Sequence, residues 1–353
     1  MGLGMDIGSY NAKLIELTQD KNKTYLTNSG ISTLLPADVA FESEKLTVNL
    51  ISSRIKELLH SSNISTRKNN NAVLGIPASR SIIKHMVTLE MDEDELSSTL
   101  ELEAKKQLSG AKSDIIVDYH VLGKHKTELD KINVILLATT QNEVKRLNTI
   151  SSQTGYNKSI LNPDPLALLN CYLANYEQSN GSVDVIIHTG YTNTGILVIA
   201  EDQSLFFREI KKGTDTFIRE IMQREKTDYL EVSKYLIDKG VSYADTSSND
   251  INDSPDSEIN VEITGYKPYH DLVDDIRKTL KYYLKNNTNV HYNQFFLSGG
   301  ASKLNGFKAL IDEQLMIETA YLDPFINIEC DKVPDNPMQY TIATGLALRT
   351  LMK

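Results

Sequence analysis

Residues 5–14 read MDIGSYNAKL, and residues 187–196 repeat the same pattern as IHTGYTNTGI. In each stretch an apolar run leads into a turn of glycine and small polar residues, and a second apolar run follows. Gly8 and Gly190 fall in one register, as do Asn11 and Asn193. The pattern predicts two β-hairpins with tight loops, one in each half of the chain.

A third glycine-rich stretch, FLSGGA at residues 296–301, follows a predicted strand and precedes a predicted helix. Backbone N–H groups at such a place can meet a nucleotide. Any one of the three stretches is most often only a turn, but their order along the chain is similar to that of the actin, heat-shock chaperone and sugar-kinase ATPases. This resemblance implies an α/β, actin-like two-domain fold, in which two facing loops grip the polyphosphate of ATP.

Composition limits the class of protein. The chain has 353 residues, 40% of them hydrophobic, and a formal net charge of −10. The length allows about two domains, and the acidic balance without a basic stripe argues against nucleic acid as a partner. The sequence has no signal peptide and no uncharged apolar run of about 18 residues, so we expect a cytosolic protein. Cys171 and Cys330 have no metal-ligand spacing.

The spacing of apolar residues predicts the coarse organisation. It predicts a helix over 50–59 and a strand over 72–76. A small α/β unit follows, with a strand over 82–89, a helix over 92–108, strands over 115–122 and 132–139, and a helix from 142. The helix over 92–108 has an acidic first turn and a basic last turn, as the helix dipole favours. Further helices are expected over 166–173 and 272–284.

The chain as a whole resembles the PilM family of type IV pilus assembly proteins, which are actin-like and related to the cell-division protein FtsA. The resemblance covers almost the whole length. Its landmarks are GMDIGS (4–9), GIPAS (75–79), DYHVLG (118–123), LSGGA (297–301) and ATGLAL (343–348). The first and fourth are shared by the whole superfamily, whereas DYHVLG and the inserted unit around it are more specific.

The resemblance also implies a division into domains. A first actin-like domain is expected from residues 1–79, 154–178 and 335–353, an inserted partner-binding subdomain from 80–153, and a second actin-like domain from 179–334. The acidic, turn-rich stretch 241–260 is expected to be a flexible surface loop. Its spacing matches no EF-hand calcium loop.

The function implied by the resemblance is that of a cytoplasmic ATP-binding adaptor in the inner-membrane complex that assembles type IV pili for twitching motility. Its expected partner is the short N-terminal cytoplasmic tail of the bitopic protein PilN, and pilus motor ATPases are further candidates. The tail would dock as an extended peptide in a groove of the inserted subdomain. The protein would then be peripheral on the inner membrane through its partners, without inserting into the membrane itself.

The expected cofactors are ATP and Mg²⁺. Asp6 offers a hard oxygen that can hold Mg²⁺ through water, Gly8 allows close backbone approach, and Ser9 and Asn11 are donors for phosphate oxygens. Lys13 is either a further contact or a solvated strand residue. The other cofactor-binding candidates are Gly190, Thr192, Asn193 and Thr194 in the second loop, Gly213 after it, and Gly299, Gly300 and Ala301 along the sugar and α-phosphate.

The second loop departs from the superfamily at His188, where related ATPases usually carry an aspartate that holds metal-bound water or orients the attacking water. Imidazole is a poor ligand for Mg²⁺, although it could act as a base near neutral pH. We therefore expect nucleotide binding with slow or no hydrolysis, and assign no catalytic residue. Glu231 and Lys234 are either ribose or adenine contacts or a solvated helical pair.

Two other hypotheses about the function stay open. An FtsA-like division protein would polymerise and tether itself through a C-terminal amphipathic helix, and we expect no such anchor after the apolar helix near residue 347. A sugar-kinase-type phosphotransferase would need a catalytic acid in the second loop, where His188 stands.

Overall fold

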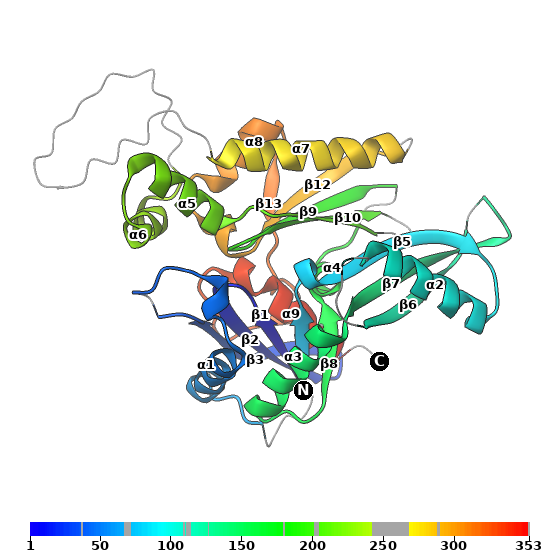
Figure 1. Cartoon of the computed structure of the whole chain (residues 1–353), viewed down its shortest axis with the longest axis horizontal. Coiled ribbons are helices and arrows are strands. Elements are labelled where there is room, and N and C mark those ends of the chain that lie inside the picture. The colour runs from blue at the N-terminus through cyan, green and yellow to red at the C-terminus, as the bar shows by residue number, and fades with distance from the viewer. Residues whose placement is uncertain are drawn as a thin grey trace, which may run out of the picture.

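A computed structural model of the chain describes residues 1–36, 38–66, 72–108, 110, 114–125, 127–178, 181–200, 205–241, 268–287 and 290–351. These residues form three β-sheets (Figure 1). Two of the sheets lie one above the other, and the third projects to one side. The two stacked sheets carry the two predicted hairpins.

The first sheet has the strand order β14-β3-β2-β1-β4-β8. Its strands are β1 (Gly2–Ile7), β2 (Asn11–Asp20), β3 (Lys23–Thr33), β4 (Ala72–Ile76), β8 (Ser159–Pro163) and β14 (Ile328–Glu329). β1, β2 and β3 pair antiparallel, whereas β4 and β8 continue the sheet in parallel pairing. The helices of this half are α1 (Val48–Ser61), α3 (Gln141–Thr154), α4 (Asp164–Asn175) and α9 (Thr341–Arg349).

The second sheet has the order β11-β10-β9-β12-β13. Its strands are β9 (Val183–Thr189), β10 (Thr194–Ala200), β11 (Leu205–Ile210), β12 (Tyr292–Ser298) and β13 (Thr319–Tyr321). An antiparallel hairpin again extends through two parallel strands, so the order matches β3-β2-β1-β4-β8 strand for strand. The helices here are α5 (Thr214–Glu225), α6 (Tyr229–Lys239), α7 (Pro268–Asn286) and α8 (Phe307–Leu315).

The two predicted hairpins close in the same way. In the first, the N–H of Gly8 donates to the carbonyl of Asn11 at 3.1 Å, and in the second the N–H of Gly190 donates to the carbonyl of Asn193 at 2.9 Å. The shared register read from the sequence is therefore a shared backbone geometry.

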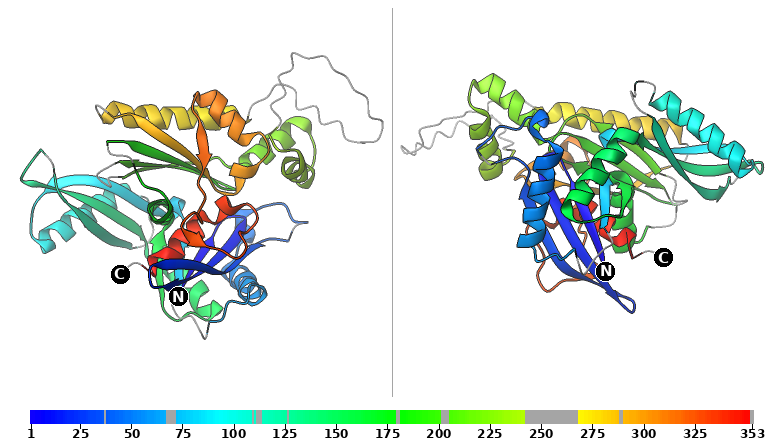
Figure 2. Two further views of the ribbon diagram at one scale, coloured as in Figure 1. Left: turned by 180° about the vertical axis from the view of Figure 1, so that it is seen from behind. Right: turned by 60° about the horizontal axis from the view of Figure 1, so that its bottom comes forward.

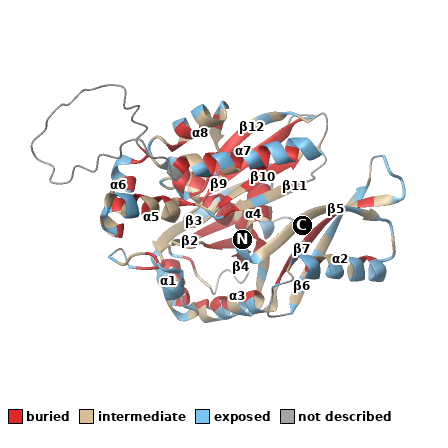
Figure 3. Cartoon of the chain, turned by 45° about the horizontal axis from the view of Figure 1, so that its top comes forward, coloured by how far each residue is buried: buried red, intermediate tan, exposed pale blue. Residues whose placement is uncertain are grey.

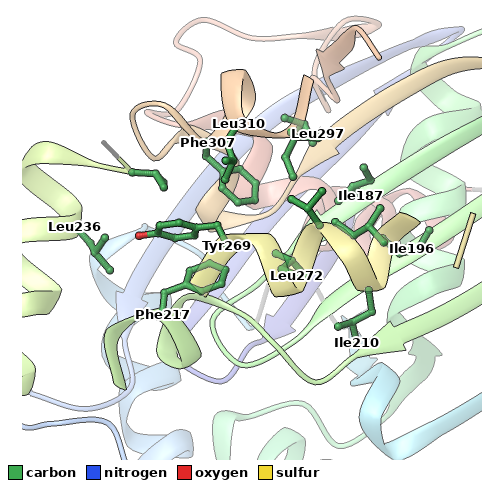
Figure 4. Packing of buried hydrophobic residues seen from close by; sticks show 14 of the residues in the cluster. Ile187, Ile196, Ile210, Phe217, Leu236, Tyr269, Leu272, Leu297, Phe307 and Leu310 are labelled. Carbon is green, nitrogen blue, oxygen red and sulfur yellow. The ribbon is translucent and has the colours of Figure 1, made fainter. Parts of the chain in front are cut away.

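The stacked sheets have separate outer layers and a common inner layer. Ile51, Ile55 and Leu147 of α1 and α3 pack on the outer face of the first sheet. Helices α5, α7 and α8 cover the outer face of the second, with Phe217, Leu272, Phe307 and Leu310 against Ile187, Ile196 and Leu297 (Figure 4). Between the sheets lie α4 and α9 (Figures 1 and 2). Buried residues line both sheets, while the outer helices expose one face (Figure 3).

The third sheet is a unit of its own with the order β5-β7-β6. It consists of β5 (Ser81–Leu89), β6 (Ile115–Lys124) and β7 (Lys131–Thr140), and α2 (Glu93–Gln107) covers one face. The expected helix over 92–108 is confirmed by α2. Asp92 caps its start, since its side chain accepts a hydrogen bond from the N–H of Glu95 at 2.9 Å. The expected limits put α3 in the inserted subdomain and β14 in the second domain, whereas in the structure α3 packs on the first sheet and β14 pairs with β3. The limits themselves stay a prediction.

Most of the stretch 241–260 lies outside the described residues; only Val241 is inside, and its N–H donates to the carbonyl of Asn305 at 2.7 Å. In the part of the chain that the structure describes, every helix is too short or too polar to cross a bilayer.

The contact between α4 and α9 leaves no room for a side chain at Gly345. A Cβ added there would lie 1.8 Å from the carbonyl oxygen of Ala167. We expect Gly345→Ala to lower the free energy of unfolding by about 1–3 kcal/mol, because overpacking forces the helices apart. Gly110→Ala, whose Cβ would meet no atom within 4 Å, is the control. Urea unfolding followed by circular dichroism measures both, and equal midpoints would contradict this packing.

Candidate functional site

A cavity of about 310 Å³ lies between the two stacked sheets, where the two hairpin loops face each other. It is also lined by the start of α4, by α6 and by the 3₁₀ turn η3 (Gly300–Lys303) after β12. Eleven of the predicted site residues line it: Asp6, Gly8, Ser9, Asn11, Lys13, Gly190, Thr192, Asn193, Gly299, Gly300 and Ala301. Residues far apart in the sequence, such as Ser9 and Thr192, thus line the same cavity.

Thr194 and Gly213, the other two predicted residues, do not line the cavity. Thr194 is fully buried and donates its hydroxyl to the carbonyl of Lys212 at 2.8 Å. A Cβ at Gly213 would lie 2.6 Å from the carbonyl oxygen of Tyr191. Thr194 therefore ties the start of β10 to Lys212, and Gly213 packs against the backbone of the second loop.

The two hairpin loops contact each other directly. The hydroxyls of Ser9 and Thr192 are 2.8 Å apart. Beside them the rings of Tyr10 and Tyr191 stack, with centroids 4.3 Å apart, and Phe41 meets Tyr191 edge-on at 5.0 Å. These contacts join the two halves of the molecule at one rim of the cavity, so the halves are already closed over it.

Acidic side chains outnumber basic ones among the described residues that line the cavity. The ammonium of Lys13 lies 2.9 Å from the Asp6 carboxylate, and both side chains are largely buried, so Lys13 is not a solvated strand residue. Among the described residues that line the cavity, Lys13 is the only lysine or arginine, whereas Asp6, Asp164 and Glu209 supply three carboxyl groups. Because this one ammonium is already paired with Asp6, it leaves little free positive charge for a polyanion, which would therefore need an accompanying cation.

Asp164 was not among the predicted site residues. The sequence pattern predicts a helix that begins at residue 166, so it leaves Asp164 in the turn before that helix. The structure begins α4 at Asp164, which lines the cavity with one carboxyl oxygen, Oδ1, buried and without a hydrogen-bond partner. Burial, followed by the charge of Asp6, raises the pKa of this carboxyl well above its ordinary value, and Lys13 opposes the shift.

Glu209 on β11 is the second carboxyl group that sequence reasoning missed. Its Oε1 accepts a hydrogen bond from the side-chain amide of Asn193 at 3.0 Å. Burial raises the pKa of Glu209, and the hydrogen bond from Asn193 opposes that shift. One donor of Asn193 is therefore occupied within the chain, which the repeat of Asn11 and Asn193 does not reveal.

His188 stands at the end of β9 and lines the cavity. Its Nδ1 is 2.9 Å from the hydroxyl oxygen of Ser298. Burial, with a smaller effect of the Lys13 charge, lowers the pKa of the imidazole from 6.5 to about 3. His188 is therefore neutral throughout the physiological range.

The far end of the cavity is apolar. It is lined by Ile218 of α5, Ser233, Leu236 and Ile237 of α6, and Leu304 after η3. Glu231 and Lys234 do not line it, and Glu231 instead accepts a hydrogen bond from the hydroxyl of Thr227. A planar apolar group fits this end better than a charged one.

The chain is similar to proteins of known family and structure. The sequence model of the family described as "Type IV pilus assembly protein PilM" matches residues 4–351. A solved structure described as a PilM-PilN type IV pilus biogenesis complex is similar over 100% of this chain and 99% of its own, with 18% identity and a TM-score of 0.76.

Two more distant structures share the fold. The ethanolamine utilization protein EutJ from Carboxydothermus hydrogenoformans is 13% identical over 98% of this chain and 89% of its own, with a TM-score of 0.51. A diol dehydratase-reactivating factor in nucleotide-free form is 8% identical over 99% of both chains, with a TM-score of 0.54. The actin-like fold class predicted from the sequence is confirmed.

The buried Asp164 carboxyl makes stability depend on pH. Because its pKa is raised in the folded state, stability is lost as the pH rises above about 3.9, the value in an unfolded chain. Without nucleotide or Mg²⁺, we expect Asp164→Asn to be more stable than the unaltered protein at pH 7, because the amide stays uncharged at every pH while the buried carboxyl must either ionise or hold its proton.

Chemical unfolding between pH 4.5 and 7.5 measures this difference, which should grow with pH. Asp118→Asn, at an exposed position on β6, is the control and should follow the unaltered protein. A constant difference between Asp164→Asn and the unaltered protein across this range would show that the carboxyl is not held in its protonated form.

Proposed function

This chain belongs to the PilM family of type IV pilus assembly proteins, and from this membership we propose that it is an ATP-binding adaptor of the pilus assembly complex that binds the cytoplasmic tail of a PilN protein. The observation that carries the proposal is the family match over residues 4–351. The similarity to the PilM–PilN complex along the whole chain supports it. The adaptor would lie on the cytoplasmic face of the inner membrane, held there by its partner.

For the nucleotide, the cavity supports a definite orientation. The polyphosphate would lie between the two hairpin loops, whose glycines allow close approach of the backbone. Gly299 has a φ of +89° and packs against the backbone of Thr189, whereas a Cβ at Gly300 would meet no atom within 4 Å, which leaves room for the sugar and the α-phosphate. The base would lie at the apolar end near Leu236 and Ile237.

The charges of the cavity favour a nucleotide that brings Mg²⁺ with it. Among the described residues of the lining, the single ammonium, Lys13, is already paired with Asp6, and carboxyl oxygens are hard ligands of the kind that Mg²⁺ prefers. Asp164 Oδ1 and Asn11 Oδ1 are buried acceptors without a partner. The described residues form no cluster of three or more metal ligands, so Mg²⁺ would be held by Asp6 through water and by the nucleotide itself. The metal would neutralise phosphate charge.

We propose slow or no hydrolysis of the bound nucleotide. A neutral His188 stands where related ATPases place a carboxylate, and imidazole does not replace a carboxylate beside Mg²⁺. The nucleotide would then act mainly by bridging the two halves of the molecule, which add their own contacts at Tyr10 and Tyr191.

The third sheet is our candidate for the PilN-binding surface. β5 and β6 are its edge strands, and an extended peptide can add to such an edge through backbone hydrogen bonds. Side chains alternate along β5, so Ile83 and Val87 point away from α2. Ile83 packs into the core near α4, whereas Val87 and Leu89 farther along are exposed. An apolar peptide side chain could bury them.

The nucleotide site is tested by thermal unfolding with and without Mg-ATP. We expect Asp6→Asn to lose most of the gain in melting temperature that Mg-ATP gives, because the amide keeps an acceptor for Lys13 but no longer attracts the metal. Asp331→Asn, at an exposed position, should keep the full gain. An undiminished gain in Asp6→Asn would rule out Asp6 as the metal-binding carboxylate.

The partner is tested by calorimetric titration with a synthetic peptide of the PilN cytoplasmic tail from the same genome, with and without Mg-ATP. We expect saturable binding of the peptide and none of its scrambled version. Val87→Glu should weaken binding at least tenfold, whereas Ile326→Glu, at another exposed apolar position, beside the first sheet, should not.

No binding in either condition would contradict the adaptor function. Equal binding by both variants would instead move the peptide site away from β5.

A further inference from the structure

His188 begins a chain of hydrogen bonds that runs from the cavity into the core. Its Nδ1 is 2.9 Å from the hydroxyl of Ser298, which is 2.6 Å from the hydroxyl of Thr341 at the start of α9. Thr341 in turn donates to the backbone carbonyl of Met338 at 3.2 Å. Ser298 and Thr341 are fully buried, so water cannot supply a proton to or accept one from this chain.

The carbonyl at the end of the chain sets its direction, because a carbonyl oxygen only accepts. If Thr341 donates to Met338, Ser298 must donate to Thr341, and His188 Nδ1–H must donate to Ser298. Each of the three links then holds one proton. In the reverse direction, the link between Thr341 and Met338 would have no proton and would bring two oxygen lone pairs together.

From this direction we infer that His188 is held in the Nδ1–H tautomer, so that its bare Nε2 is a neutral hydrogen-bond acceptor that holds a water molecule at the phosphate end of the cavity. The lone pair at Nε2 repels phosphate oxygens, because they are acceptors themselves. It can instead accept a hydrogen bond from a water molecule, whose oxygen then stays free for other contacts. The hydrogen bond that the structure gives to the ammonium of Lys13 goes to the Asp6 carboxylate, at 2.9 Å.

The role of the water rests on the nucleotide site proposed above, whereas the tautomer does not. The lowered pKa of His188 supports both, because the imidazole stays neutral well below pH 6. Ser298 and Thr341 are positioning residues in this arrangement: they contact His188 or each other and set which nitrogen carries the proton.

The tautomer is measured by NMR of the full chain with ¹⁵N-labelled histidine at pH 8, without nucleotide. Neutral histidine in water prefers the Nε2–H form, so the exposed His60 and His291 should show it, and His188 should show the opposite. The His188 signal is assigned by its loss in His188→Asn. An Nε2–H signal from His188 would overturn the inference, because the chain of hydrogen bonds would then run the other way.

Ser298→Ala removes the acceptor for Nδ1–H, so His188 should shift toward the Nε2–H form. Thr341→Val breaks the next link and should shift it in the same sense, which gives a second test if Ser298→Ala does not fold. Ser151→Ala, a buried serine that donates to Tyr156 far from the cavity, is the control and should leave the His188 signal unchanged. An unchanged signal in both chain variants would overturn the positioning role.

The water is tested by calorimetry with Mg-ADP, alone and with aluminium fluoride, whose complex with ADP takes a water in line with the bound phosphate mimic. His188→Gln keeps an acceptor near the position of Nε2, while His188→Asn keeps only the link to Ser298. We expect aluminium fluoride to raise the affinity for Mg-ADP in the unaltered protein and in His188→Gln. In His188→Asn, the factor by which aluminium fluoride raises the affinity should be at least tenfold smaller.

The water-binding role would be overturned if aluminium fluoride raised the Mg-ADP affinity of His188→Asn as much as that of the unaltered protein. It would also be overturned if aluminium fluoride had no effect on the unaltered protein. No binding of Mg-ADP at all would contradict the proposed nucleotide site, and with it the water, whereas the tautomer would stand or fall on the NMR result.

Discussion

The close contact between α4 and α9 is the constraint on which the rest of the structure depends. The two helices form the only layer that touches the inner faces of both large sheets within the described residues, and Gly345 lets their backbones meet at Ala167. Because both helices begin at the cavity, their spacing decides where Asp164 and Thr341 stand. A hydrophobic contact deep in the core thereby sets the geometry of polar groups at the site.

The cavity combines groups whose charge states are set by one another. Asp6 and Lys13 form a buried ion pair, and the pair leaves Asp164 as a carboxyl that burial and the Asp6 charge hold toward its protonated form. His188, close to the same ammonium, stays neutral. The site thus offers little free positive charge to a polyphosphate, which is the physical reason for assigning Mg²⁺ to the proposed nucleotide.

The cavity and the third sheet are joined by a short piece of chain. Pro77, Ala78 and Ser79 line the cavity, and the chain passes directly into β5. At this junction Arg80 forms an ion pair of 2.6 Å with Glu143 of α3, and Thr139 of β7 donates to the carbonyl of Arg80 at 2.7 Å. The proposed peptide-binding unit is therefore anchored where the wall of the cavity ends.

Sequence periodicity and turn chemistry determined the elements that depend on neighbours along the chain. The two hairpins, the capped helix after Asp92 and the glycine pair after β12 follow from local patterns, and so do the residues those loops bring to the cavity. Local patterns also carry the resemblance to the family. Even the start of α4 was missed by only two residues, because Asp164 and Pro165 favour a turn as much as a first helical turn.

Only the tertiary structure decided which groups meet across the fold. The orphaned oxygen of Asp164, the bond between Asn193 and Glu209, and the chain from His188 through Ser298 to Thr341 join segments that are distant in sequence. Burial shifts the protonation of Asp164 and His188, and burial comes from packing rather than from residue type. The sequence by itself determined the loops that can hold a nucleotide, while the packing of α4 and α9 between the sheets decided the charge and proton positions those loops face.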